Sequence, residues 1–232
     1  MLTQTKIGLS GNALKCIACI CMLMDHMGYI LFPTAMWLRL VGRIAFPIFA
    51  YLMAEGCRYT RRPWRHFLEV FLMGVICQVV YQVAEPNRSG IYLNILLTFS
   101  VSIALCNVLL AIPSEKLRLG VFFSMAITLW LTVIPLQRRG VDFDYSFWGI
   151  LLPVVLVLLK AHWQRLVAEG AILCLMAMER NQGQWYALLA LLPLALYSGA
   201  RGSRKFKYVF YLFYPLHLAA IYGIYWALTL LK

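Results

Sequence analysis

The residues best suited to chemistry lie in the first hydrophobic segment, Ala13 to Phe32. Three of its side chains are ionisable: Lys15, Asp25 and His26. At roughly 100° and 1.5 Å per residue, a helix places Lys15 and His26 on one face about 16 Å apart, with Asp25 roughly 80° away. Charged side chains inside a membrane span are costly and usually face a bundle interior or a wet cavity. We therefore expect a functional site along this face.

The chemistry that these residue types suggest is proton transfer. An imidazole titrates near neutral pH and suits general base catalysis, and a neighbouring carboxylate can orient it or stabilise the imidazolium. We expect His26 to act as the base and Asp25 to orient it. In a protein of another class, Lys15, Asp25 and His26 would instead form a proton or ion relay.

The composition is that of an integral membrane protein. Of the 232 residues, 62% are hydrophobic and only 13% are charged, about half the charged fraction of a typical soluble domain. Apolar runs recur along the whole chain, and no stretch between them is long enough for a separate soluble domain. The first run is full length, carries charge and lacks a small-x-small cleavage site, unlike a signal peptide. We predict one all-α polytopic membrane domain over residues 1–232.

The hydrophobic pattern predicts nine membrane-spanning helices. Their predicted ranges are 13–32, 36–55, 67–84, 91–111, 117–135, 145–160, 165–178, 184–199 and 206–230. With the N-terminus inside, the inner connections hold thirteen Lys and Arg and the outer connections hold five. This bias predicts a cytoplasmic N-terminus and an external C-terminus. It also explains the net charge of +12 without nucleic acid, which we do not expect as a partner.

A cluster of arginines follows the second predicted span. Arg58, Arg61, Arg62 and Arg65 fall within eight residues, and Glu55 lies three residues before Arg58. A guanidinium presents a planar fork to phosphate oxygens, so this cluster can bind a phosphate-rich carrier. The alternative is a stop-transfer cluster that fixes topology and contacts lipid head groups.

Arg43, Glu55 and Asn94 are candidates for the lining of a cavity. Arg39 and Arg43 share one helix face ahead of Pro47, which should kink or open its helix. The fourth predicted span carries a polar line that starts at Asn94, and such lines often make interhelical hydrogen bonds.

Three further candidates lie later in the chain. Asp144 stands beside aromatic residues in a predicted outer loop. Tyr214 and His217 lie three residues apart in the last span, around a proline. A single intramembrane histidine is more often a hydrogen-bonding partner than a catalyst.

The seven cysteines are scattered, nearly all within apolar runs. Cys16 and Cys19 form a single C-x-x-C without a second pair, which is weak evidence for a metal or redox site. We interpret the cysteines as small packing residues and expect no bound metal.

Four segments of the sequence resemble the TraX family. They are D-H-M-G-Y-I-L-F-P from Asp25, R-L-V-G-R-I-A-F-P-I-F-A-Y-L-M-A-E-G-C-R-Y-T-R from Arg39, N-I-L-L-T-F from Asn94 and K-Y-V-F-Y-L-F-Y-P-L-H-L from Lys207. The namesake of this family is required for N-terminal acetylation of F-type pilin. The resemblance extends from about Leu14 to Tyr225.

The resemblance implies a function and roles for four residues. TraX proteins are grouped loosely with acyltransferase-3-type membrane enzymes, which share a basic residue, ten residues and a histidine in the first span, and an R-x-x-R later. Lys15 with His26, and Arg58 with Arg61, match these two motifs. By resemblance, His26 takes part in acyl transfer and the basic residues handle the acyl-CoA.

The sequence and the resemblance together predict an acetyl-CoA-dependent membrane acetyltransferase. Its acceptor would be a pilin-like N-terminal amine or a cell-surface glycan at the outer face of a bacterial cytoplasmic (inner) membrane. Lys15, Arg43, Arg58 and Arg61 would contact the carrier. The alternative is a solute or lipid transporter, or an assembly factor, without catalysis.

Overall fold

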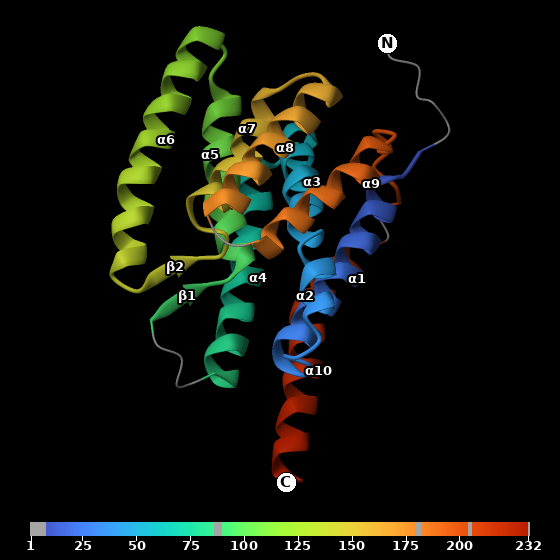
Figure 1. The fold of residues 1–232 in the computed structure, drawn as a ribbon. Helices are drawn as coiled ribbons and strands as arrows, with labels where there is room; N and C mark the ends of the chain where they lie inside the picture. Colours follow the sequence, from blue (N-terminus) through green and yellow to red (C-terminus); the bar gives the residue numbers. More distant parts are fainter. Residues whose placement is uncertain (1–7, 86–89, 180–181, 204–205, 232) are drawn as a thin grey trace. The chain divides into compact units, whose positions relative to one another are not determined.

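The fold is almost entirely helical. The computed structural model describes residues 8–85, 90–179, 182–203 and 206–231. The chain divides into two compact units, of residues 1–52 with 161–232 and of residues 53–160. We describe each unit separately (Figure 1).

The first unit contains the two ends of the chain. Its helices are α1 (Gly11–Ile30), α2 (Met36–Gly42), the first half of α3 (Ala45–Tyr59), α8 (His162–Glu179), the 3₁₀ helix η1 (Gln182–Ala190), α9 (Leu191–Ala195) and α10 (Lys207–Leu230). Helix α1 packs against both α2 and α10. Ser10 caps α1, because its side chain accepts a hydrogen bond from the Ala13 amide.

Two glycines allow α1 and α2 to approach closely. A Cβ added at Gly28 would lie 2.8 Å from the Cβ of Leu38, and one at Gly42 would collide with the side chain of Asp25. Because neither glycine has a side chain, the backbones can come together here. The close approach places Asp25 directly against α2.

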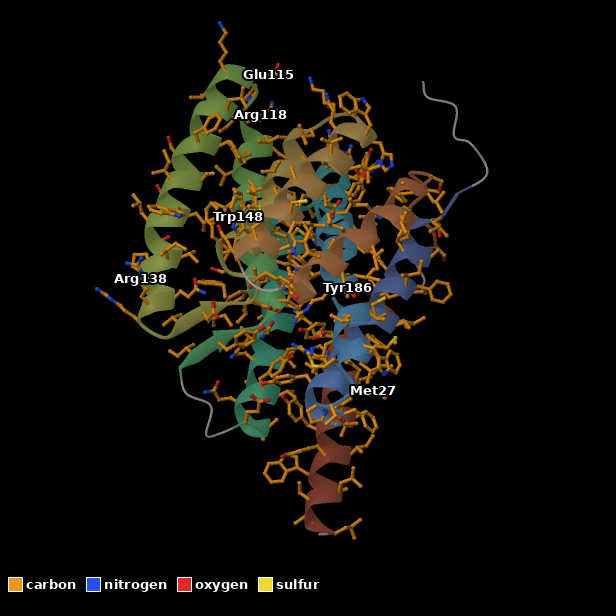
Figure 2. The ribbon with its side chains drawn as sticks, viewed as in Figure 1. Met27, Glu115, Arg118, Arg138, Trp148 and Tyr186 are labelled. Carbon is orange, nitrogen blue, oxygen red and sulfur yellow. The ribbon has the colours of Figure 1, made fainter. Side chains whose placement is uncertain are left out.

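The second unit contains the second half of α3 and the middle of the chain. Its other elements are α4 (Pro63–Ala84), β1 (Ile91–Leu93), α5 (Ile95–Ala111), α6 (Glu115–Arg138), β2 (Val141–Phe143) and α7 (Ser146–Leu158). Helix α5 packs against α4 and α7. Figure 2 shows Glu115 and Arg118 at one end of α6 and Arg138 at the other, so its labelled charges flank an apolar helix.

Five helical segments in the described part of the chain are long and apolar enough to cross a membrane. They are Gly11–Ile30, Met36–Tyr59, Pro63–Ala84, Glu115–Arg138 and Leu212–Leu230. Helices α5 and α7 are apolar but shorter. Large apolar side chains along α4 and α6 are exposed, as on helices that face lipid. The chain is therefore a multi-pass membrane protein.

The prediction of nine spans is confirmed only in part. Residues 184–199 were predicted as one span but form a 3₁₀ helix followed by the five-residue α9. Residues 36–55 form two helices, with the break at Arg43 and Ile44. Pro47 then lies in the first turn of α3, where its missing N–H costs no helical hydrogen bond.

A short parallel strand pair was not predicted. Ile91, Tyr92 and Leu93 pair with Val141, Asp142 and Phe143, and Figure 1 shows β1 and β2 side by side. The predicted fourth span, 91–111, therefore begins as a strand, and its helix starts only at Ile95. Gly90 and Gly140, at φ +81° and +84°, adopt the left-handed backbone that turns the chain into each strand.

Candidate functional site

The centre of the candidate site is a pair of histidines on α1 and α10. Nδ1 of His26 lies 2.8 Å from Nε2 of His217, and the two ring centroids are 4.9 Å apart. The other ring nitrogen of His217, Nδ1, lies 2.8 Å from the carbonyl oxygen of Phe213 on the preceding turn. His217 is buried. Two titratable groups from opposite ends of the chain thus share one hydrogen bond.

Tyr214 completes an aromatic enclosure around this pair. Its ring meets His26 edge-on at 6.3 Å and His217 edge-on at 5.4 Å, measured between ring centroids. Phe213 stacks on His217 with ring planes 13° apart. Because rings surround them on several sides, the imidazoles have little freedom to rotate. The sequence placed Tyr214 and His217 near a cavity, and the structure brings both to His26.

Lys15 faces the same neighbouring helix as His26. Its ammonium group lies 5.3 Å from the centroid of the Phe210 ring on α10, within the range of a cation–π contact. The shared face of Lys15 and His26 predicted from helical geometry is therefore confirmed, since both side chains contact α10.

Asp25 makes its ion pair with α2. Oδ2 of Asp25 lies 3.0 Å from Nη1 of Arg39, and the positive charge of Arg43 also acts on this carboxylate. The Arg39 guanidinium lies 5.0 Å from the Tyr29 ring centroid. We expected Asp25 to orient His26, whereas its carboxylate is engaged with a neighbouring helix.

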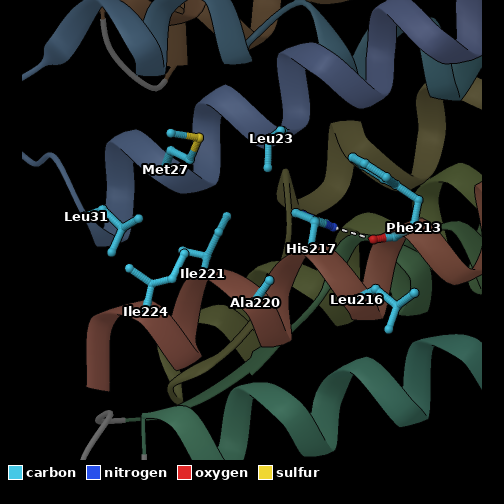
Figure 3. A pocket seen from close by; sticks show the side chains of 9 residues that line it. All are labelled: Leu23, Met27, Leu31, Phe213, Leu216, His217, Ala220, Ile221 and Ile224. Carbon is cyan, nitrogen blue, oxygen red and sulfur yellow. Dashed lines mark hydrogen bonds between the residues drawn. The ribbon is translucent and has the colours of Figure 1, made fainter. Parts of the chain in front are cut away.

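A groove opens beside the histidine pair. It has a volume of about 400 Å³ and lies between α1 and α10 (Figure 3). Its lining residues are Leu23, Met27, Leu31, Phe213, Leu216, His217, Ala220, Ile221 and Ile224. His217 is the polar side chain among them. The groove therefore gives an apolar approach to one end of the pair.

The arginine cluster belongs to the second unit. Nη1 of Arg58 donates a 2.6 Å hydrogen bond to the carbonyl of Leu159, which ends α7. Arg61 lies two residues beyond the end of α3 and is exposed. Arg65 forms an exposed ion pair with Glu69 at 3.2 Å. Arg61 is thus accessible to a ligand. Arg58 instead donates to a carbonyl at the C-terminal end of α7.

Two other predicted cavity residues in this unit are buried. Asn94 caps α5 by accepting hydrogen bonds from two amides, and its Nδ2 donates to Gly74 O at 2.8 Å and to Gln78 Oε1 at 3.0 Å. Further along the same line, Ser102 donates to the carbonyl of Ile150 on α7. The predicted interhelical hydrogen bonds of this line are confirmed. Glu55 is also buried.

Asp144 lies at the end of β2. Its amide donates to the carbonyl of Leu93, and its side chain is hydrogen-bonded to Tyr92. Burial, followed by the charge of Asp144, raises the pKa of the Tyr92 hydroxyl well above its usual range. Asp144 therefore ties the end of β2 to β1.

Two features of the site were not predicted from the sequence. Arg39 was noted beside Arg43, but its partnership with Asp25 was not predicted. The bond between His26 and His217 joins residues 191 positions apart, which no local spacing reveals. The signal that could have found it is that both histidines lie within long apolar runs, where each needs a polar partner. Among the described residues, no group of three His, Cys, Asp or Glu could hold a metal ion.

Comparison with known proteins assigns the chain to a family. Residues 10–225 match the family described as "TraX protein". The "Probable fimbrial assembly protein FimC, serogroup H1" of Dichelobacter nodosus is 28% identical over 242 residues, covering 93% of this chain and 96% of that protein. No solved structure matches.

Proposed function

Since the chain belongs to the TraX family, we propose that it transfers an acetyl group from acetyl-CoA to an amine or hydroxyl acceptor. The observation that carries this proposal is the hydrogen-bonded pair of His26 and His217 between two apolar helices. The relative from Dichelobacter nodosus is named for fimbrial assembly, which favours a pilus-related role and a pilin-like N-terminal amine as acceptor. A cell-surface glycan hydroxyl is the other acceptor class.

His26 acts as the general base in this proposal. It removes a proton from the acceptor amine or hydroxyl as that atom forms a bond to the thioester carbonyl carbon. The bond between this carbon and the CoA sulfur then breaks, and the sulfur receives the proton from His26. A positioned base of this kind contributes about 10²–10⁴-fold to the rate.

The basic residues contact the carrier. We assign the phosphates of acetyl-CoA to Arg61, which is exposed, and to Arg58. Lys15, close to the N-terminal end of α1, and Arg43 are further candidates for contact with the carrier. Asp25 supports α1 through its ion pair with Arg39 on α2, while Asn94 and Asp144 hold elements of the second unit together. The membrane would be the bacterial inner membrane, where cytoplasmic acetyl-CoA is available on one side.

The second candidate function is that of an assembly factor without catalysis. It is favoured by the name of the Dichelobacter nodosus relative, which states assembly and no reaction. In that case the ionisable residues of α1 would form a relay or a structural network. The two candidates differ in whether the chain binds acetyl-CoA.

Thermal unfolding with and without acetyl-CoA separates the two functions. A ligand that binds only the folded state at 100 times its Kd adds about 2.7 kcal/mol of stability. We expect acetyl-CoA to raise the melting temperature of the wild type, and Arg61→Ala to reduce this shift. Arg138→Ala is the matched control, because Arg138 is an exposed arginine at the end of α6, outside the cluster. The same melting temperature with and without acetyl-CoA would favour the assembly factor.

A further inference from the structure

The hydrogen bonds of His217 determine where its own proton lies. Its Nδ1 is 2.8 Å from the carbonyl oxygen of Phe213, and a carbonyl can only accept. Nδ1 of His217 must therefore carry the hydrogen. In a neutral imidazole the other nitrogen is then an acceptor, so Nε2 of His217 presents a lone pair to His26.

This lone pair determines the tautomer of His26. Nδ1 of His26 lies 2.8 Å from Nε2 of His217, so Nδ1 must donate. His26 is also hydrogen-bonded to the backbone of Met22, four residues earlier, the spacing at which His217 donates from Nδ1 to Phe213. The basic lone pair of His26 is then on Nε2.

We infer that His217 is the positioning residue of the acyltransferase site, holding His26 in the Nδ1–H tautomer with Nε2 as the base. The effect of His217 on catalysis rests on the proposed function. The position of the hydrogen on His26 rests on the contacts of the two histidines alone. Both nitrogens of His217 are committed, one as donor to Phe213 and one as acceptor from His26, so His217 is not itself the base.

His217 also has a role after proton transfer. When Nε2 of His26 takes the proton of the acceptor, Nδ1 still donates to His217, now from a cation, and a charge-assisted hydrogen bond is stronger. This is the part that we expected Asp25 to play. The Asp25 carboxylate, however, is paired with Arg39 on α2.

The neighbouring rings keep this geometry in place. Phe213 stacks on His217, and Tyr214 meets both imidazoles edge-on. A rotation of either imidazole would therefore displace an aromatic contact as well as a hydrogen bond.

The first test is nitrogen-15 NMR of ring-labelled histidine in the wild type and in His217→Leu. The chain has four histidines, so each signal can be assigned by single substitution. We expect the hydrogen of both His26 and His217 on Nδ1 in the neutral pair, and a mixture of tautomers for His26 in His217→Leu. A hydrogen on Nε2 of His217 would overturn the inference whether or not the protein is active.

The second test is kinetic. We expect His217→Leu to lower kcat about 10²–10³-fold, within the range of one general base, with KM changed less than threefold. His217→Gln offers an amide oxygen near the position of Nε2 and should recover at least tenfold of that loss. His66→Gln, which changes a histidine of the second unit, is the matched control and should leave kcat unchanged.

The two tests separate this inference from the proposed function. Full kcat in a folded His217→Leu protein would overturn the positioning role while leaving the acetyltransferase intact. A wild type without transfer would contradict the proposed function, and the ring spectra would still decide the tautomers. If His217→Leu does not fold, the wild-type spectrum and the kcat of His217→Gln decide: a loss in His217→Gln as large as that of His26→Ala overturns the role.

Discussion

Two helices of this protein carry lines of polar side chains, and the lines differ in their partners. On α1, His26 is hydrogen-bonded to another titratable side chain, His217. On α5, Thr98 and Ser102 donate to backbone carbonyls. A hydroxyl bonded to a carbonyl stabilises packing without changing charge, whereas a pair of imidazoles can accept a proton. The partner of a polar side chain, more than its polarity, therefore decides whether the residue can take part in proton transfer or only stabilises packing.

The largest expected difference between the two lines concerns turnover. We predict that His26→Ala lowers kcat by about 10²–10⁴-fold, since it removes a general base. Its melting temperature should fall as well, because Nε2 of buried His217 loses its partner, so kcat is compared per folded molecule. Steady-state release of CoA and thermal unfolding measure the two effects. Equal activity of His26→Ala and wild type would show that the polar line of α1 is as structural as that of α5.

The next effect concerns stability at the start of α5. We predict that Asn94→Ala destabilises the protein by about 1–3 kcal/mol, because the cap of α5 is lost and the carbonyl of buried Gly74 loses its hydrogen bond from the Asn94 side chain. The kcat per folded molecule should be unchanged. Denaturant unfolding gives the change in stability, and the turnover rate divided by the concentration of folded protein gives kcat. A loss of kcat in fully folded Asn94→Ala would show that the polar line of α5 takes part in the reaction.

The smallest effect is expected for a single hydroxyl of the α5 line. Ser102→Ala removes the bond to the Ile150 carbonyl, and such interhelical bonds are worth about 0.6 kcal/mol on average. We predict a shift of that size and wild-type turnover. Thr98→Val removes the equivalent hydrogen bond on the same face of α5, and we expect the same result from it. A change in the pH dependence of kcat in either variant would contradict a purely structural role.

Local sequence patterns were sufficient for the parts of the fold that depend on local physics. The long apolar runs of α1, α4 and α6 identified these helices, because a membrane span requires continuous hydrophobicity. The common face of Lys15 and His26 followed from helical geometry, and the structure confirms it through α10.

The remaining features depend on contacts between distant segments. The strand pair joins residues 91–93 to residues 141–143, and three-residue strands carry too little alternation to be recognised. Asp25 was assigned to His26 because they are adjacent in sequence. Its ion pair with Arg39 instead depends on the close approach of α1 to α2 at Gly42.

The most direct test of the central claim is acetyl transfer in inside-out membrane vesicles. Radiolabelled acetyl-CoA is supplied outside the vesicles, at the cytoplasmic face. An acceptor peptide with a free N-terminal amine is enclosed in their lumen, at the outer face, and the wild type is compared with His26→Ala. We expect labelled peptide and released CoA with the wild type, and a loss of about 10²–10⁴-fold with His26→Ala. Transfer at the same rate by both proteins would contradict the assignment of His26 as the base. No transfer by a folded wild type that binds acetyl-CoA, with either an amine or a hydroxyl acceptor, would contradict the acetyltransferase itself.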